Sequence, residues 1–135
     1  MSAPSQREQL RRFALTLPSA AEDFPWGEPV VKVRRDGEPP AWRRGLVHGN
    51  TFLWHGRPED DDPKVSVKLT ESYEQAVTVA GATPMTHSGL GQWGWLTFSL
   101  SAAPLDVVFD WVEESWRAAA PKKLLRDLAS QGRLR

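Results

Sequence analysis

The chain has 135 residues, and its 17 lysines and arginines balance 17 aspartates and glutamates. This neutral total excludes a uniformly basic, histone-like nucleic-acid binder and a polyacidic tail protein. The sequence has no cysteine, which excludes disulfide scaffolds, thiolate metal sites and thiol nucleophiles. Because no apolar run approaches a membrane span and the N-terminus lacks an apolar signal core, we expect a cytoplasmic protein with a single domain over residues 1–135.

The first predicted element is an amphipathic helix over residues 5–17. Ser5 and Glu8 have the spacing of a capping box, in which a hydroxyl and a carboxylate satisfy free backbone N–H groups. Apolar residues then recur at helical intervals until Pro18, which stops the run.

Short segments rich in alternating apolar and polar residues follow, and they predict strands. The predicted strands are 30–35, 51–55, 64–70 and 93–100. Between them lie a turn or loop at 36–40, an acidic loop at 57–63 and a glycine-rich loop at 83–92. Short strands joined by turns favour an antiparallel sheet.

Three more helices are predicted in the second half of the chain. Ser72 can cap the first, and Gly81 suits the left-handed position behind it. Pro104 opens the second, and a basic C-terminal helix within 121–131 runs from Lys122 to Ser130. Helices of this length can cover one face of a sheet. We therefore expect an α+β fold, a two-layer sandwich in which an antiparallel sheet has helices packed on one face and a partly wet opposite face.

Strand alternation predicts which side chains share the uncovered face. Apolar residues of the strands at 64–70 and 93–100 should meet the helices: Val65, Val67, Leu69, Leu96, Phe98 and Leu100. The uncovered face should then carry Lys32, Arg34, Lys64, Lys68, Trp93 and Trp95. Seven tryptophans are many for a core of this size, so we expect some at the surface.

These six residues are the candidate nucleic-acid or ligand-binding residues. Cations neutralise phosphate, and indoles can stack on bases or wedge into a groove. In the alternative interpretation, Trp93 and Trp95 pack under a loop or against the lysine stems. The neutral total can hide a basic patch, because residues 30–57 and 121–135 each carry a net charge of +4 while 59–62 carry −4.

Other motifs do not assemble a known site. The glycines at 89–94 match GxGxxG but lead into a predicted strand, where a dinucleotide site needs a helix. The acids at 59–62 lack calcium-loop spacing, and His48, His55 and His87 lack the spacing of a metal site. We expect Trp111 and Trp116 to pack in or beside the core. No nucleophile, base and oxyanion group come together, so we expect no catalytic residues, no metal and no cofactor.

Several short motifs, in order and spacing, resemble the MmcQ/YjbR family of small bacterial proteins over roughly residues 8–125. They are Leu17-Pro18, Pro25-Trp26-Gly27, Val67-Lys68-Leu69-Thr70, Thr83-Pro84, His87, Trp95-Leu96-Thr97-Phe98, Glu114-Ser115-Trp116 and Ala120-Pro121-Lys122-Lys123-Leu124. The family usually has tyrosine at the position of Trp116, and its loop corresponding to 36–44 is shorter.

The resemblance implies a double-wing α+β fold, like that of CyaY or type III secretion chaperones, and a DNA-binding label that rests largely on fold analogy. It supplies no catalytic residues. Our first hypothesis is a non-enzymatic module that binds DNA weakly through the six candidate residues. The alternative is a small-molecule or peptide-binding module that uses the same tryptophan-lined face for an aromatic ligand. A third hypothesis places a homodimer contact there, so the protein is expected to be a monomer or a homodimer.

Overall fold

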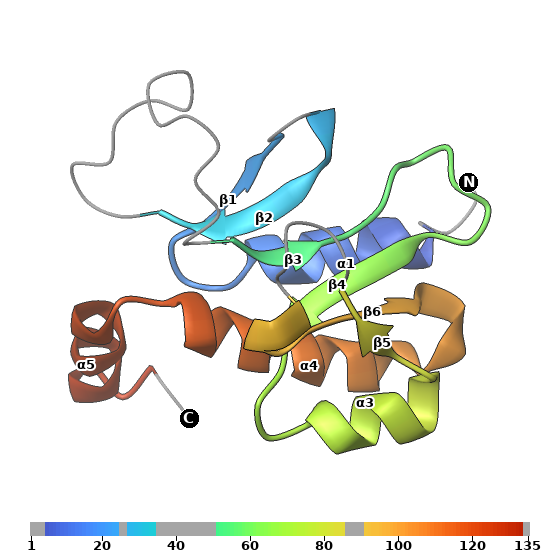
Figure 1. Ribbon diagram of the computed structural model, residues 1–135. Helices are drawn as coiled ribbons and strands as arrows, with labels where there is room; N and C mark the ends of the chain where they lie inside the picture. Colours follow the sequence, from blue (N-terminus) through green and yellow to red (C-terminus); the bar gives the residue numbers. More distant parts are fainter. Residues whose placement is uncertain (1–4, 25–26, 35–50, 86–90, 134–135) are drawn as a thin grey trace.

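The computed structural model describes residues 5–24, 27–34, 51–85 and 91–133. The elements in chain order are α1 (Gln6–Leu15), β1 (Ala20–Asp23), β2 (Val30–Val33), β3 (Thr51–Trp54), β4 (Lys64–Lys68), α3 (Tyr73–Ala80), β5 (Thr83–Pro84), β6 (Trp95–Ser99), the 3-10 helix η3 (Leu100–Ala102), α4 (Leu105–Ala119) and α5 (Lys122–Ser130). The predicted α+β class is confirmed (Figure 1). None of the helices in these four ranges combines the length and apolar character needed to cross a membrane.

In the described part of the chain, six strands form one sheet in the order β1-β2-β3-β4-β6-β5, and every neighbouring pair is antiparallel. The two edge strands were not predicted. β1 contains Ala-Ala-Glu-Asp, which has no β-branched residue, and β5 has only two residues. Pairing with β2 and β6 makes these segments strands, because their own residues have little strand preference.

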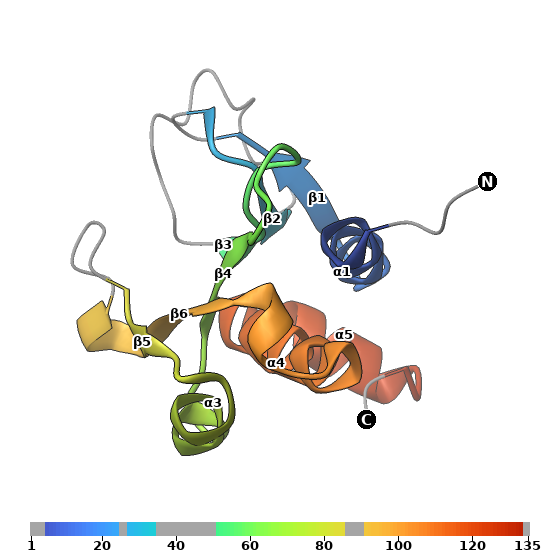
Figure 2. The same ribbon diagram turned by 90° about the vertical axis from the view of Figure 1, so that its right-hand side faces the viewer.

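The helices α1 and α4 lie on the same side of the sheet, which Figure 2 shows with α3 below them. α4 packs against α1, β2, β3 and β4, so it is the central helix of this layer. The core residues predicted for the segments 64–70 and 93–100 are all buried in the main hydrophobic cluster, together with Trp111 and Trp116 of α4. The indole N–H of Trp116 donates to the Pro18 carbonyl at 3.0 Å, which ties α4 to the end of α1.

The predicted helix ends are largely confirmed. Ser5 accepts a hydrogen bond from the backbone N–H of Glu8 at 3.1 Å, as a capping serine does. The Glu8 carboxylate binds Arg11 and Arg12. Gly81 has a φ of 63° directly behind α3, the left-handed conformation that glycine adopts without a Cβ clash.

The strand β3 is buried on both faces of the sheet. The register between β2 and β3 shifts next to Val31, and this bulge allows both Phe52 and Leu53 to join the helix-side core. Trp54 belongs to a different cluster. The two sides of β3 therefore contribute to two separate apolar clusters.

Candidate functional site

The sheet face that turns away from α1 and α4 has a dry, apolar centre. Val30, Trp54, Met85 and Trp95 form a second cluster there, and the Trp54 and Trp95 residues are 8% and 6% exposed. Strand pairing brings the cluster together, since Trp54 lies opposite Val30 while the Met85 N–H donates to the Trp95 carbonyl at 2.9 Å. The expectation that Trp95 is presented to solvent is therefore wrong. Trp95 does lie on the predicted face, but its indole would have to leave this cluster to stack on a base.

Lys32 lies on the same face, and its exposure is also different from the expectation. Its side chain is 9% exposed, and its ammonium lies 3.2 Å from the carboxylate of Asp23 on β1. The cost of burying a charge makes such a lysine dependent on its counter-ion. The expectation that Lys32 presents a solvent-facing charge is wrong, because its side chain is buried and pairs with Asp23 of the edge strand β1.

Lys64 and Lys68 occupy opposite ends of β4, which separates them by about 13 Å at the usual rise of a strand. The Lys64 ammonium lies 3.3 Å from Asp62 and donates to the Ser99 hydroxyl at 2.6 Å. Hydrogen bonds from Ser99 and then Lys64 lower the pKa of the Asp62 carboxyl. Lys64 is thus an exposed cation whose charge is balanced beside the acidic loop.

Lys68, at the other end of β4, lies beside Gly94, the residue that follows the exposed Trp93. Trp93 is 64% exposed and belongs to a short 3-10 turn that directly precedes β6. Gly94 follows with a φ of 93°, its carbonyl accepts the Leu69 N–H at 3.0 Å, and a Cβ there would lie 3.8 Å from the Lys68 Cγ. The expected exposure of Trp93 is confirmed, although Trp93 precedes the strand in which we had placed it.

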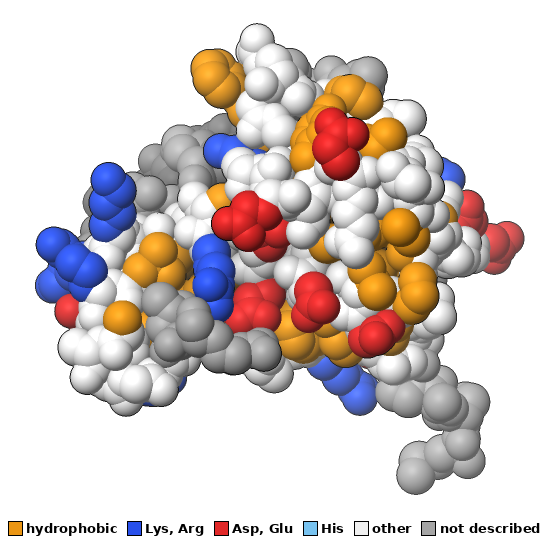
Figure 3. Space-filling view, turned by 90° about the horizontal axis from the view of Figure 1, so that it is seen from below, with side chains coloured by type: hydrophobic (Ala, Val, Ile, Leu, Met, Phe, Trp, Pro, Cys, Tyr) orange, Lys and Arg blue, Asp and Glu red, His pale blue; other side chains and the backbone are white. Residues whose placement is uncertain are grey.

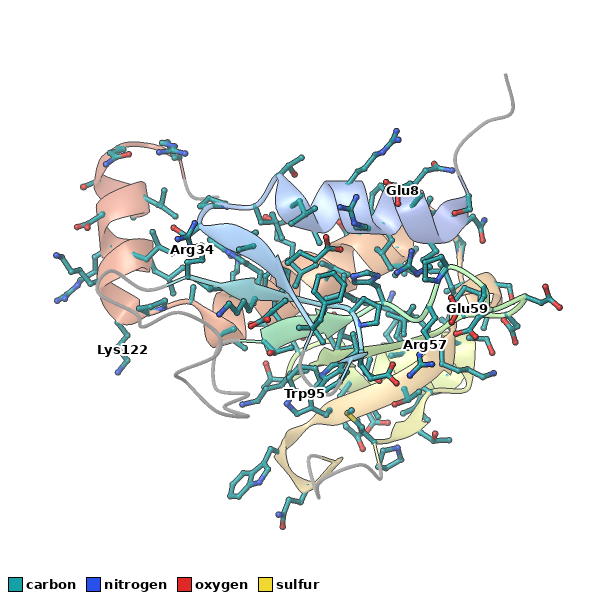
Figure 4. All side chains as sticks on the ribbon, turned by 90° about the horizontal axis from the view of Figure 1, so that it is seen from above. Glu8, Arg34, Arg57, Glu59, Trp95 and Lys122 are labelled. Carbon is teal, nitrogen blue, oxygen red and sulfur yellow. The ribbon has the colours of Figure 1, made fainter. Side chains whose placement is uncertain are left out.

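Contacts around the C-terminal half of α4 place Arg34 and the cations of α5 toward the end of the molecule where Lys68 lies. The backbone N–H of Lys68 donates to Ser115 of α4 at 2.9 Å. The backbone N–H of Arg34 donates to the Ser19 carbonyl at 2.8 Å, next to the Pro18 carbonyl that binds Trp116 of α4. The basic helix α5 starts just after α4, and Figure 4 shows Arg34 and Lys122 toward one end of the molecule.

We call this group the basic end; it consists of Arg34, Lys68, Lys122, Lys123 and Arg126. Among the described residues, none of these five side chains has a carboxylate within ion-pair distance. Three of the five lie on α5, where Asp127 is the acidic residue among them. The basic end therefore offers positive charge that no described side chain neutralises.

The neighbouring helical face is acidic. A cavity of about 540 Å³ between α4 and the segment after β4 is lined mainly by Glu71, Asp110, Glu113 and Glu114. Figure 3 shows acidic side chains across the middle of this view and basic side chains at the end that α5 forms. A polyanion would be repelled from this middle and attracted to the basic end.

The structure also describes part of the glycine motif and one of the three histidines that the sequence analysis considered. Gly91 and Gly94 lead into β6, as predicted, while positions 86–90, with His87, lie outside the described residues, as do the loop 36–40 and His48. His55 is fully buried. Within the described ranges, no three His, Asp or Glu side chains lie together in a group that could hold a metal ion.

The fold places the chain among α+β proteins with a helical layer against one face of an antiparallel sheet. A family model described as YjbR matches residues 15–118, well over half of the chain. The chain therefore belongs to the YjbR family, which confirms the resemblance seen in its motifs.

The fold is similar to that of a protein whose structure has been solved. The crystal structure of the Deinococcus radiodurans protein DR2400, with the family domain DUF419, superposes with a TM-score of 0.61. The alignment covers 86% of this chain and 79% of that chain at 20% sequence identity, so the likeness shows the fold alone. No curated protein matches the sequence significantly.

The alternating pattern of the strands did not predict the apolar cluster around Trp54 and Trp95. The signal was present in β3, where Phe52, Leu53 and Trp54 form a continuous apolar run. Such a run is typical of a strand that is buried on both faces, and it indicates that the second face of the sheet is covered too.

Proposed function

We propose that this protein binds nucleic acid weakly and without catalysis, through the basic end together with Trp93. The observation that supports this function best is the exposed indole of Trp93, one residue before the Gly94 that lies beside Lys68, together with cations that lack described ion-pair partners. Of the six candidate residues, Arg34, Lys68 and Trp93 keep the role that we predicted. Lys32, Lys64 and Trp95 are assigned to the structure of the sheet.

In this proposal the cations bind the phosphates of the nucleic acid and the indole binds a base. Cations neutralise phosphates and release counter-ions, while an exposed indole can stack on an unpaired base. Binding should be weak because the whole chain is neutral and because acidic side chains line the neighbouring helical face. We expect single-stranded DNA to bind better than a duplex, since stacking on Trp93 requires an accessible base face.

The test is fluorescence anisotropy with labelled single-stranded and duplex DNA over a series of KCl concentrations. Each phosphate contact contributes about 0.7 to the log–log salt slope for a single strand and about 0.9 for a duplex. The triple substitution Lys122→Gln, Lys123→Gln and Arg126→Gln should reduce both the affinity and this slope. Lys64→Gln is the matched control, because Lys64 is an exposed lysine that is paired with Asp62.

Trp93→Ala should weaken single-strand binding by about 1–3 kcal/mol, the usual range for one stacked base. It should also remove any change in tryptophan fluorescence that DNA causes in the wild-type protein. The absence of binding at low salt would overturn the proposal. An equal loss in the Lys64→Gln control and the triple variant would overturn the assignment to the basic end.

The alternative role of the tryptophan-lined face in binding a small molecule or peptide has less support. The aromatic cluster on that face is filled by its own side chains. Among the described residues, the cavities of about 540, 440 and 210 Å³ are lined by residues other than Trp93 and Trp95. A homodimer formed through exposed Trp93 stays a prediction, which sedimentation at several concentrations would test.

A further inference from the structure

The end of the molecule opposite the basic end contains a cavity of about 440 Å³. It lies between α1, the end of β1 and the segment that follows β3, and its lining includes Arg7, Arg11, Glu22, Phe24, Arg57 and Glu59. Figure 4 shows Glu8, Arg57 and Glu59 at this end, with Arg34 and Lys122 at the other. Its volume falls within the range of roughly 300–1,000 Å³ that is usual for small-molecule sites.

Two of the three arginines in the lining are already paired. Arg11 donates from Nε and Nη2 to the two carboxylate oxygens of Glu22 at 2.7 and 3.0 Å, a bidentate pair. Arg57 pairs with Glu28 at the rim. These pairs build the wall of the cavity and have little charge left for a ligand.

Arg7 is different because it is 9% exposed and has no described ion-pair partner. Its Nε donates to the Gly56 carbonyl at 2.8 Å, and no carboxylate of the described residues lies within ion-pair distance of its guanidinium. Burial lowers the pKa of Arg7, which reflects the cost of holding this charge away from water. A buried cation that has no carboxylate of the described residues at ion-pair distance is a strong binding group for an anion that enters the cavity.

The side chain next to Arg7 cannot supply the missing negative charge. His55 is fully buried, its ring nitrogens have no hydrogen-bond partner among the described groups, and its Nε2 lies 3.7 Å from Glu22. Burial, and then the charge of Arg7, lowers the pKa of His55 to about 4, so the ring is neutral at pH 7. Among the described residues, neither His55 nor a carboxylate at ion-pair distance therefore accepts from Arg7.

The same cavity also offers an unpaired negative charge and an apolar wall. Glu59 is exposed, lines the cavity and has no ion-pair partner in the described part of the chain. Phe24 is 58% exposed, and Pro29 and Pro58 extend the apolar part of the lining. One free cation, one free carboxylate and an aromatic ring thus border a single space.

We propose that this cavity binds a free amino acid with an apolar side chain, whose carboxylate pairs with Arg7 and whose ammonium group faces Glu59. A planar carboxylate suits the guanidinium because two parallel hydrogen bonds can form. A simple anion would gain the contact with Arg7 but would be repelled by Glu59, so the site favours a zwitterion. Phe24 provides a surface for the apolar side chain.

The test is isothermal titration calorimetry with phenylalanine and leucine as probes. N-acetyl-phenylalanine lacks the ammonium group, and phenylalanine methyl ester lacks the carboxylate. We expect saturable binding of at least one amino acid and binding of each phenylalanine derivative that is at least tenfold weaker than that of phenylalanine. The absence of heat for both amino acids at millimolar concentration, or equal binding of phenylalanine and its derivatives, would overturn the proposal.

Two variants assign the contacts. Glu59→Gln changes an exposed residue and should fold; it should weaken phenylalanine binding at least fivefold but strengthen the binding of N-acetyl-phenylalanine, because Glu59 no longer repels its carboxylate. Arg7→Gln should weaken the binding of phenylalanine and of N-acetyl-phenylalanine but not that of the methyl ester, whose ammonium group Arg7 repels. Thermal melting checks that this variant folds. Arg12→Gln is the matched control, an exposed arginine of α1 that pairs with Glu8. If Glu59→Gln binds phenylalanine as tightly as Arg12→Gln does, the proposed ammonium contact is wrong.

Discussion

Glu114 of α4 holds the residue in front of α3, Ser72, by two hydrogen bonds. The Ser72 hydroxyl donates to Oε1 at 2.7 Å and its backbone N–H donates to Oε2 at 3.2 Å. Oε2 also accepts the backbone N–H of Thr70 at 3.0 Å. We had expected the Ser72 side chain to cap α3 itself, but its hydroxyl is used to bind a carboxylate from another helix.

Glu114→Ala should therefore destabilise the protein by about 1–3 kcal/mol, because it removes an acceptor that serves three donors. Urea denaturation followed by circular dichroism measures this change. Asp110→Ala is the control, since Asp110 is exposed on the same helix and should change stability by less than about 0.5 kcal/mol. If both substitutions change the unfolding free energy equally, the three hydrogen bonds that Glu114 accepts do not stabilise the protein as proposed.

The buried His55 predicts a loss of stability in mild acid. Its pKa is about 4 in the folded protein and about 6.5 when exposed, so the unfolded chain binds the extra proton between these values. The stabilisation is complete above pH 6.5 and decreases as the pH falls toward 4, by about 2 kcal/mol between pH 7 and pH 5. The lowered pKa of Glu22, caused chiefly by its hydrogen bond with Arg11, acts in the same direction below pH 4.5.

The measurement is the free energy of unfolding from pH 7 to pH 5 for wild type and His55→Phe. The decrease in unfolding free energy from pH 7 to pH 5 should largely disappear in His55→Phe, whatever this substitution does to stability at pH 7. An unchanged slope would show that another group accounts for the pH dependence.

The two tryptophans at the start of β6 should respond very differently to the same substitution. Trp95→Ala opens a cavity in the second apolar cluster and should cost about 3–5 kcal/mol. Trp93→Ala removes an exposed ring and should change stability by less than about 0.5 kcal/mol. Thermal and urea unfolding of both variants test the assignment of Trp95 to the structure and of Trp93 to the surface.

Gly56 and Gly81 form another matched pair, because both have a positive φ, of 75° and 63°. A Cβ on Gly56 would lie 2.9 Å from the Pro63 Cβ and 3.3 Å from the Lys64 carbonyl oxygen, whereas a Cβ on Gly81 meets nothing within 4 Å. Gly81→Ala should cost about 1 kcal/mol from the left-handed backbone alone. Gly56→Ala adds the clash and should cost about 2 kcal/mol or more. Comparable unfolding midpoints for the two variants would be the contradictory result.

Residues close together in the sequence could be assigned well without the structure. The bounds of α5 were predicted as Lys122 to Ser130, and the serine at the start of α1 and the glycine behind α3 were recognised from local signals. The core-facing residues of β4 and β6 were also correct, because alternation along one strand determines which side chains share a face.

The candidate site could be predicted only in part. Strand alternation predicts on which face of the sheet a side chain lies, but it does not predict whether other segments cover that side chain. Lys68 and Trp95 are strand partners on the predicted face, but only Trp93, in front of the strand, presents its indole to solvent. The cover over Trp95 comes from Val30 of β2, Trp54 of β3 and Met85, the residue after β5. The counter-ion of Lys32 comes from β1, a strand that the sequence did not indicate.

The sequence by itself determined the helices, the alternating strands and the family, because caps, periodicity and short motifs depend on neighbouring residues. Only the tertiary structure decided which cations are neutralised and which indoles are buried. It also brought Arg7, Phe24 and Glu59 to one cavity. The physical reason is that burial and pairing depend on groups from distant segments, and the effect of a charge is set by its nearest partner and its distance from water.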